Sequence, residues 1–207
     1  MRFFLALSLL AAFPSLAAVP EKGEGTITLQ AGPRVLLPTN GTYIDQQGAR
    51  HQVFQPQALI GLGYQYDDDL HFKIEIGYAL DRYKLASGVD LSVRSIPIFL
   101  AIDTTLATGS WFTVFGGGGL GYSLNSANKG PDIYNEANST AFYLALGIRM
   151  RLTEKLAVVL EDRFTLASAQ VDPDPAMPKL NVGGNLLSLG LQLHFLEPEE
   201  KGHPKAP

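Results

Sequence analysis

Large apolar residues alternate with small or polar residues along most of the chain after residue 24, and this two-residue period recurs in about eight blocks. In a typical block, Phe72, Ile74 and Ile76 alternate with Lys73 and Glu75. Because successive side chains of a β-strand point to opposite faces, each block predicts a strand with one apolar face and one polar or small face. The chain is therefore predicted to be an all-β protein.

The connections between the blocks alternate in length. Polar and mostly long segments follow the first, third, fifth and seventh blocks, at 38–52, 84–90, 125–139 and roughly 170–183. Tight turns follow the second, fourth and sixth blocks, at 67–69, 107–110 and 153–155. An antiparallel meander with this rhythm has all its long loops at one end. Bacterial outer-membrane barrels are built in this way, with short periplasmic turns and longer extracellular loops.

The bulk of the side chains indicates which face lies inside. Phe, Leu, Ile and Tyr dominate one face, and Gly, Ala, Ser, Thr and Gln with isolated charges dominate the other. An eight-stranded barrel has an interior only just wide enough for side chains, which suits small residues and paired charges. The large apolar face exceeds what a soluble monomer exposes, so we assign it to lipid. We predict an eight-stranded antiparallel up-and-down transmembrane β-barrel. Its predicted lumen network is Arg34, Lys73, Glu75, Asp81, Arg149, Arg151, Glu161 and Arg163.

Five of the chain's 21 glycines fall within the six positions 116–121. Gly116, Gly118 and Gly121 match the dinucleotide-binding pattern G-x-G-x-x-G, but that fingerprint needs a following helix within a βαβ unit. Here the two-residue alternation continues instead, so we predict a strand in which the inward glycines make room for larger side chains. These strand-packing glycines are Gly117, Gly119 and Gly121.

The N-terminus has the features of a secretory signal peptide, predicted at 1–18. An early cation precedes an apolar run and small residues up to Ala18. The barrel is expected at 24–196, and the charged, proline-rich segment 197–207 is expected to be a disordered periplasmic tail. The absence of cysteine excludes disulfides and thiolate metal sites. The net charge of -4 argues against nucleic-acid binding.

Two residues conflict with a regular barrel. Pro97 lies inside the fourth block, although a closed barrel has no edge strand to accommodate its missing N–H. Asp162 falls on the lipid-facing parity, where a carboxylate is costly. We therefore predict a β-bulge or register shift near each of these residues, and at Asp162 one that turns the carboxylate inward or pairs it.

Together these features resemble the small eight-stranded outer-membrane barrels of the OmpA/OmpX-like kind. The resemblance also rests on the strands "VFGGGGLGYSL" and "SIPIFLAID". It implies a monomer in the outer membrane of a Gram-negative bacterium, surrounded by outer-membrane lipid, with both termini in the periplasm. It also implies insertion by the barrel assembly machinery, which reads a final strand ending in an aromatic residue. Here "LLSLGLQLHF" ends at Phe195 but is followed by Leu196 and the tail.

The sequence offers no recognisable catalytic, cofactor or metal site. The histidines, His51, His71, His194 and His203, lack the spacing of metal ligands. The acidic loop segment 172–178 lacks the spacing of a calcium loop. A lipid-modifying barrel enzyme would need a serine activated by a histidine near the long loops, where only His51 lies. We therefore predict no cofactor, no metal and no catalytic residue.

Three functional hypotheses follow. The favoured one is an integral outer-membrane barrel with a side-chain-filled polar lumen, acting structurally or as a surface-interaction module through its loops, where binding residues concentrate. The first alternative is an outer-membrane barrel enzyme that modifies envelope lipid, such as lipid A. The second is a soluble periplasmic barrel that carries a ligand.

Overall fold

The computed structural model describes residues 22–36, 50–51, 55–84, 87–129, 133–170 and 179–195, so the predicted signal peptide and tail lie outside it. The long strands are β1 (Gly25–Val35), β3 (Gln55–Gln65), β4 (Leu70–Lys84), β5 (Asp90–Thr108), β6 (Phe112–Lys129), β8 (Ser139–Thr153), β9 (Leu156–Ala169) and β11 (Gly184–Phe195). The short strands are β2 (Arg50–His51), β7 (Ile133–Glu136) and β10 (Leu180–Asn181). The described residues include no helix long and apolar enough to cross a membrane.

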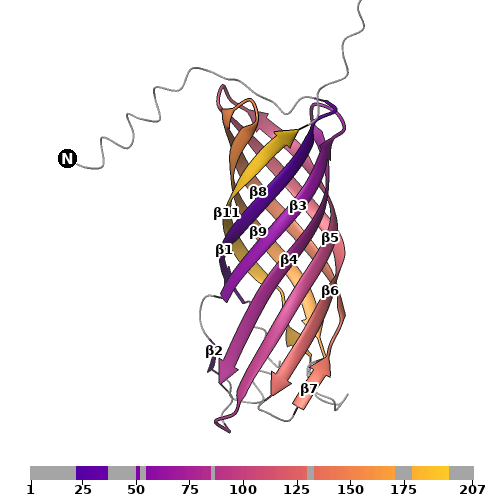
Figure 1. Ribbon diagram of the computed structural model, residues 1–207, viewed down its shortest axis with the longest axis vertical. Helices are drawn as coiled ribbons and strands as arrows, with labels where there is room; N and C mark the ends of the chain where they lie inside the picture. The colour runs from indigo at the N-terminus through magenta and orange to yellow at the C-terminus, as the bar shows by residue number, and fades with distance from the viewer. Residues whose placement is uncertain are drawn as a thin grey trace, which may run out of the picture.

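The eight long strands form a closed antiparallel barrel. Each pairs with the next long strand in the sequence, and the last strand returns to pair with the first. The closing ladder runs from Gly25 opposite Phe195 to Val35 opposite Asn185. Figure 1 shows the strands tilted around one common axis. This closure confirms the predicted eight-stranded barrel, and it leaves no open edge along the wall.

Tight turns close one end of the barrel, as the sequence predicts. They join β3 to β4 at 66–69, β5 to β6 at 109–111 and β8 to β9 at 154–155. At the other end the strands run further than expected, because β6 continues to Lys129 and pairs with β7 inside the segment 125–139 predicted to be a loop. Figure 1 shows β2 and β7 at this end. We refer to the two ends as the short-turn end and the long-loop end.

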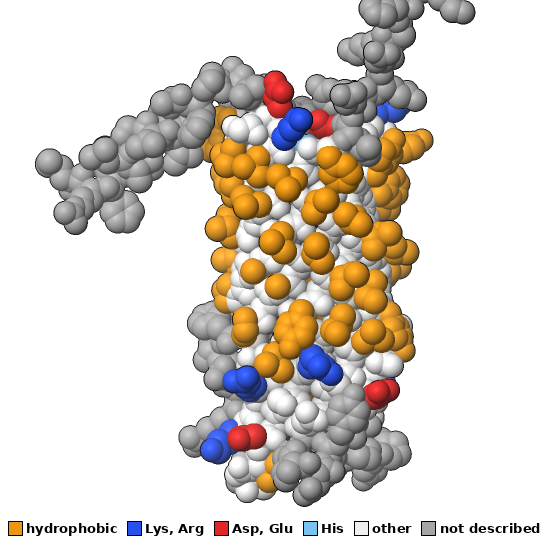
Figure 2. All heavy atoms as spheres, in the orientation of Figure 1, with side chains coloured by type: hydrophobic (Ala, Val, Ile, Leu, Met, Phe, Trp, Pro, Cys, Tyr) orange, Lys and Arg blue, Asp and Glu red, His pale blue; other side chains and the backbone are white. Residues whose placement is uncertain are grey.

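Apolar side chains cover the outside of the barrel. Leu120, Leu100 and Leu29 are 68%, 66% and 61% exposed, and similar residues occupy the outward positions of every long strand. Figure 2 shows these side chains as a broad band across the visible face of the barrel. Buried Gln, Thr, Ser and charged residues occupy the inward positions. A distribution with the apolar side outward requires an apolar solvent around the wall.

The strand register is regular at Pro97, so the predicted bulge there is wrong. The β4–β5 ladder keeps one register on both sides of the proline, and Pro97 pairs with Ser123 of β6. Gly77 of β4 leaves room for the buried proline ring, because a Cβ at Gly77 would overlap with it. Register shifts occur instead next to the short turns, at Thr105 in the β5–β6 ladder and at Arg151 in the β8–β9 ladder.

Asp162 lies on the outer wall in a regular strand, so the prediction of a bulge there is also wrong. It pairs with Leu146 of β8 and Leu187 of β11 without a register shift, and its side chain is exposed. The residues on either side of it, Glu161 and Arg163, are buried inside. Because side chains alternate along a strand, burying those two charges directs Asp162 outward.

Candidate functional site

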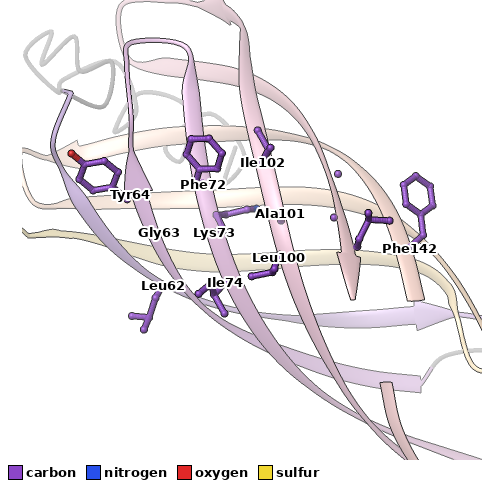
Figure 3. A pocket seen from close by; sticks show the side chains of 13 residues that line it. Leu62, Gly63, Tyr64, Phe72, Lys73, Ile74, Leu100, Ala101, Ile102 and Phe142 are labelled. Carbon is purple, nitrogen blue, oxygen red and sulfur yellow. The ribbon is translucent and has the colours of Figure 1, made fainter. Parts of the chain in front are cut away.

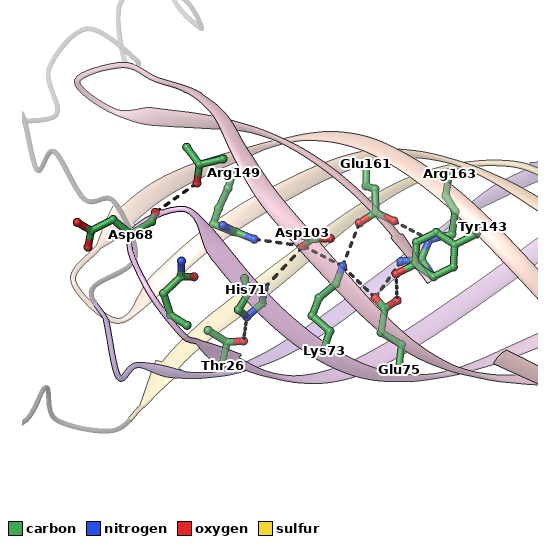
Figure 4. A network of polar contacts seen from close by, with 12 residues as sticks. Thr26, Asp68, His71, Lys73, Glu75, Asp103, Tyr143, Arg149, Glu161 and Arg163 are labelled. Atoms are coloured by element: carbon green, nitrogen blue, oxygen red, sulfur yellow. Dashed lines mark hydrogen bonds and ion pairs between the residues drawn. The ribbon is translucent and has the colours of Figure 1, made fainter. Parts of the chain in front are cut away.

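Lys73 of β4 lies at the centre of the charged side chains inside the barrel (Figure 4). Its Nζ lies 3.0 Å from Oδ2 of Asp103, 3.4 Å from Oε1 of Glu75 and 3.9 Å from Oε2 of Glu161. These carboxylates come from three different strands, β5, β4 and β9. Lys73 is buried, so these three partners replace the hydration that its ammonium loses.

Arg163 of β9 is completely buried and joins two of the same carboxylates. Its Nη2 donates to Oε1 of Glu75 at 2.8 Å, and its Nε donates to Oε1 of Glu161 at 2.7 Å. Its guanidinium lies over the Tyr143 ring, 3.9 Å from the centroid, and the Tyr143 hydroxyl donates to Oε2 of Glu75 at 2.5 Å. Arg163 therefore combines two charge-assisted hydrogen bonds with a cation–π contact.

His71 and Arg149 extend this network toward the short-turn end (Figure 4). Oδ2 of Asp103 lies 3.7 Å from Nδ1 of His71 and 3.8 Å from Nη2 of Arg149. On its other side, Nε2 of His71 forms a 2.9 Å hydrogen bond with Oγ1 of Thr26. The Arg149 guanidinium lies over the Phe115 ring, 4.9 Å from its centroid. Asp103 thus links Lys73 to His71 and Arg149, which lie nearer the short turns.

Separate ion pairs lie toward the two ends of the interior. Toward the long-loop end, Arg34 of β1 pairs with Asp81 of β4, and both side chains are buried. At the short-turn end, Nη2 of Arg151 lies 3.0 Å from Oε1 of Glu24. The other carboxylate oxygen of Glu24 lies 2.8 Å from Nδ1 of His194. Paired charges therefore run along much of the length of the interior.

Glu24 precedes β1 and lies outside the strands. Burial raises the pKa of its carboxyl, but the hydrogen bond with His194 and the charge of Arg151 outweigh burial and hold the pKa below its usual value. Glu24 is therefore ionised at neutral pH. Its stabilising contribution is present above the ordinary pKa of a glutamate and is lost as the pH falls through the lowered pKa of the folded state.

The charges inside the barrel balance. Within the described residues, the inner carboxylates are Glu24, Glu75, Asp81, Asp103 and Glu161, and the inner cations are Arg34, Lys73, Arg149, Arg151 and Arg163. The eight residues that the alternation predicts to point inward all belong to this set. Equal numbers of opposite charges in contact leave no net charge in the low-dielectric interior, where an unpaired charge is costly.

Sequence reasoning missed two members of the network, Asp103 and Glu24. Asp103 lies in the fourth block, where Pro97 left the direction of the side chains open. The available signal was the run of large apolar residues on the opposite parity, Ile98, Leu100 and Ile102, which leaves Asp103 on the inner face. Glu24 precedes the first block, so no alternation applied to it.

The inward glycines lie beside the larger side chains of neighbouring strands. Gly119 pairs with Tyr143 of β8, and Gly117 pairs with Asp103 of β5. A Cβ at either position, or at Gly121, would overlap with a neighbouring side chain or carbonyl group. The glycines of β6 therefore form a thin part of the wall against which inner side chains pack.

The part of the chain that the structure describes holds no group of three or more His, Asp or Glu residues that could bind a metal ion. His71 and His194 lie in the interior contacts described above. His203, the His51 side chain and the acidic segment 172–178 lie outside the described side chains. The residues considered for a lipid-modifying enzyme or a calcium loop are thus not placed by the structure.

Little space remains around the network. A cavity lined by residues that include Lys73, Asp103 and Arg149 has a volume of about 10 Å³. A second cavity toward the long-loop end, lined by residues that include Arg34 and Phe99, is also about 10 Å³. Each is about the size needed for a single water molecule. In these regions, side chains rather than open solvent fill the barrel.

A larger hollow of about 750 Å³ lies on the outside of the wall. Figure 3 shows Leu62, Tyr64, Leu100 and Phe142 around it. Gly118 also lines the hollow; it faces outward and has no side chain to fill the space. Because the lining is mainly apolar and continuous with the outer band, this hollow belongs to the surface that meets the surrounding apolar solvent.

The chain matches a known protein family over residues 3–195, and the family is described as "Outer membrane protein beta-barrel domain". No curated protein matches the chain in sequence.

Solved structures show the same fold. Neisserial surface protein A is 18% identical, with 84% of this chain and 98% of that chain covered and a TM-score of 0.56. The outer membrane protein OprG from Pseudomonas aeruginosa is 14% identical, with 84% and 97% covered and a TM-score of 0.58. At these identities the likeness shows the fold alone.

Proposed function

The chain belongs to the outer membrane protein beta-barrel domain family, and from this premise we propose that it is an integral outer-membrane scaffold with a closed lumen. The observation that carries this proposal is the charge-balanced network inside the barrel, in which Arg163 and Lys73 of opposite strands share Glu75 and Glu161. A barrel closed in this way works through its surfaces, which are the long loops and the lipid-facing wall.

Passage of an ion or solute would require this network to open. Separating a buried ion pair costs roughly 3–5 kcal/mol when one partner is left alone. Several pairs share partners around Lys73, so opening a path would disrupt more than one of them at once. This arrangement supports a structural or surface-interaction role over a pore.

We expect the purified, folded protein to give no stable large conductance in planar lipid bilayers. The physical reason is that ion pairs and water-sized cavities occupy the lumen. Folded protein is identified by a gel band that migrates differently before and after boiling, and the boiled sample serves as the control. A reproducible high conductance from the folded species would contradict the filled lumen.

We propose that the long loops are extracellular and that both ends of the barrel chain lie in the periplasm. Outer-membrane barrels have short periplasmic turns, and the start of β1 and the end of β11 lie at the short-turn end. Phe195 ends β11, which agrees with the aromatic ending that the barrel assembly machinery reads. A partner would then meet the loops at the opposite end, held by the rigid barrel.

We propose that the barrel is a monomer without enzymatic activity. An activated serine needs an accessible histidine as its base. Among the described side chains, the histidines are instead buried: His71 contacts Thr26, and His194 contacts Glu24. Membrane lipid covers the apolar outer wall, so this wall does not require a second copy of the chain to bury it.

Asp162→Leu is expected to stabilise the barrel in lipid vesicles by roughly 1–2 kcal/mol, because it removes a carboxylate from the lipid-facing wall. The measurement is the free energy of unfolding by urea in vesicles. Asp68→Leu is the matched control, since Asp68 is exposed in a short turn beyond the apolar band. The control should change the stability by less than about 0.5 kcal/mol. Unchanged or reduced stability of Asp162→Leu would show that this carboxylate does not face lipid.

A further inference from the structure

Three cations lie on the outer wall toward the long-loop end. Arg82 and Lys84 of β4 and Arg94 of β5 are exposed. Figure 2 shows Lys and Arg side chains directly beyond one edge of the apolar band. At the short-turn end, the β3–β4 turn instead presents the exposed acidic segment 67–69. The long-loop edge of the band between β4 and β5 therefore has the charge to attract an anion.

Arg82 and Arg94 are neighbours on adjacent strands. The β4–β5 register sets Arg82 opposite Ser92 and Arg94 opposite Leu80, so the two arginines occupy diagonal positions on the same outer face. Diagonal positions of an antiparallel pair are roughly 7–8 Å apart, within reach of long side chains. Both guanidinium groups can therefore approach a single anion held between them.

Neither guanidinium has a carboxylate within ion-pair distance among the described residues. Arg94 donates from Nε to Oγ of Ser126 at 3.3 Å. The acids nearest in register are Asp90 and Glu136, which are exposed and make no ion pair with either arginine. Among the described residues, Arg82 and Arg94 thus have no carboxylate partner, whereas each of the five inner cations has one.

We propose that Arg82 and Arg94 bind the phosphate of a phosphorylated lipid in the leaflet at the long-loop end. This inference rests on the proposed function, which surrounds the wall with lipid. The planar guanidinium matches phosphate oxygens with paired hydrogen bonds. Toward the middle of the barrel, the same outer face continues with Leu80, Tyr78 and Ile98, which contact the acyl chains of the bound molecule. A lipid uses both parts of this surface, whereas a free anion uses only the arginines.

Arg82→Gln/Arg94→Gln is the variant that tests the site. Native mass spectrometry of the folded protein in detergent measures the retention of lipid A, which carries phosphate and acyl chains. We expect roughly tenfold weaker binding or more in the variant, because hydrogen bonds to charged groups are removed. Lys155→Gln is the control, since it removes an exposed cation from a turn at the other end and should bind lipid A as the unaltered protein does.

Two further probes separate the sources of phosphate. Dephosphorylated lipid A should bind the unaltered protein as weakly as lipid A binds the double variant, and inorganic phosphate should compete poorly with lipid A. Equal retention of lipid A by both proteins, equal binding of the dephosphorylated lipid, or strong competition by inorganic phosphate would overturn the proposal. Failure of the proposed function would give a different result. If the protein were not a membrane barrel, the unaltered protein would show no heat-modifiable migration in membrane extracts, before any lipid is added.

Discussion

Arg163→Ala is expected to lower the free energy of unfolding of the barrel by about 3–5 kcal/mol, the usual cost of removing one partner from buried ion pairs. Arg163 is completely buried, and its loss leaves Glu75 and Glu161 with only Lys73 to balance two negative charges. The change also removes the cation–π contact with Tyr143. Urea unfolding in lipid vesicles measures the effect.

A charge-balancing double variant tests whether the cost comes from unpaired charge. Arg163→Met/Glu161→Gln removes one charge of each sign and leaves the Lys73–Glu75 pair in place. We expect it to be more stable than Arg163→Ala, because no carboxylate is left in excess. A loss below about 1 kcal/mol for Arg163→Ala, within the range of many ordinary substitutions, would refute the importance of the network.

Gly119→Leu is expected to prevent the barrel from folding. A Cβ at Gly119 would lie 2.5 Å from Cε1 of Tyr143 and 3.0 Å from the backbone oxygen of Leu100, so a leucine side chain has no room inside the wall. The lumen cannot expand locally, because the closed ladder fixes both neighbouring strands. The measurement is the fraction of refolded protein that shows heat-modifiable migration, which should fall to near zero.

Gly116→Leu is the matched control in the same strand. Gly116 faces outward, and the three atoms nearest to a Cβ there all belong to the side chain of Leu106, the closest at 3.1 Å. That flexible side chain can move into the surrounding lipid, so this variant should fold. Normal folding of Gly119→Leu, or equal failure of both variants, would contradict the assignment of Gly119 to the packed inner face.

The sequence predicted the direction of most side chains, because the two-residue period is regular in most strands. Lys73 and Glu75 of β4, and Glu161 and Arg163 of β9, were assigned to the lumen from parity alone. Parity does not specify which inward charges meet. Arg163 and Glu75 are 88 residues apart, and their contact depends on the stagger of strands around the whole barrel.

The two wrong bulge predictions have a common physical cause. Both assumed that an unfavourable residue must distort its own strand. At Pro97 the β4–β5 ladder omits the pair with Gly77, and that glycine leaves room for the proline ring. At Asp162 the two adjacent inward charges outweigh one outward carboxylate. In each case other residues compensate for the unfavourable one, so its strand keeps a regular register: Gly77 for Pro97, and Glu161 and Arg163 for Asp162.

The position of β4 relative to β9 has a mechanical consequence. In the circular order of the long strands these two are separated by three strands on either side, so they form opposite walls. The contacts of Lys73 with Glu161 and of Arg163 with Glu75 therefore span the barrel's diameter. They resist any flattening that would widen the distance between these two walls. The barrel keeps its cross-section under lateral pressure from the bilayer and so presents its loops at fixed spacings.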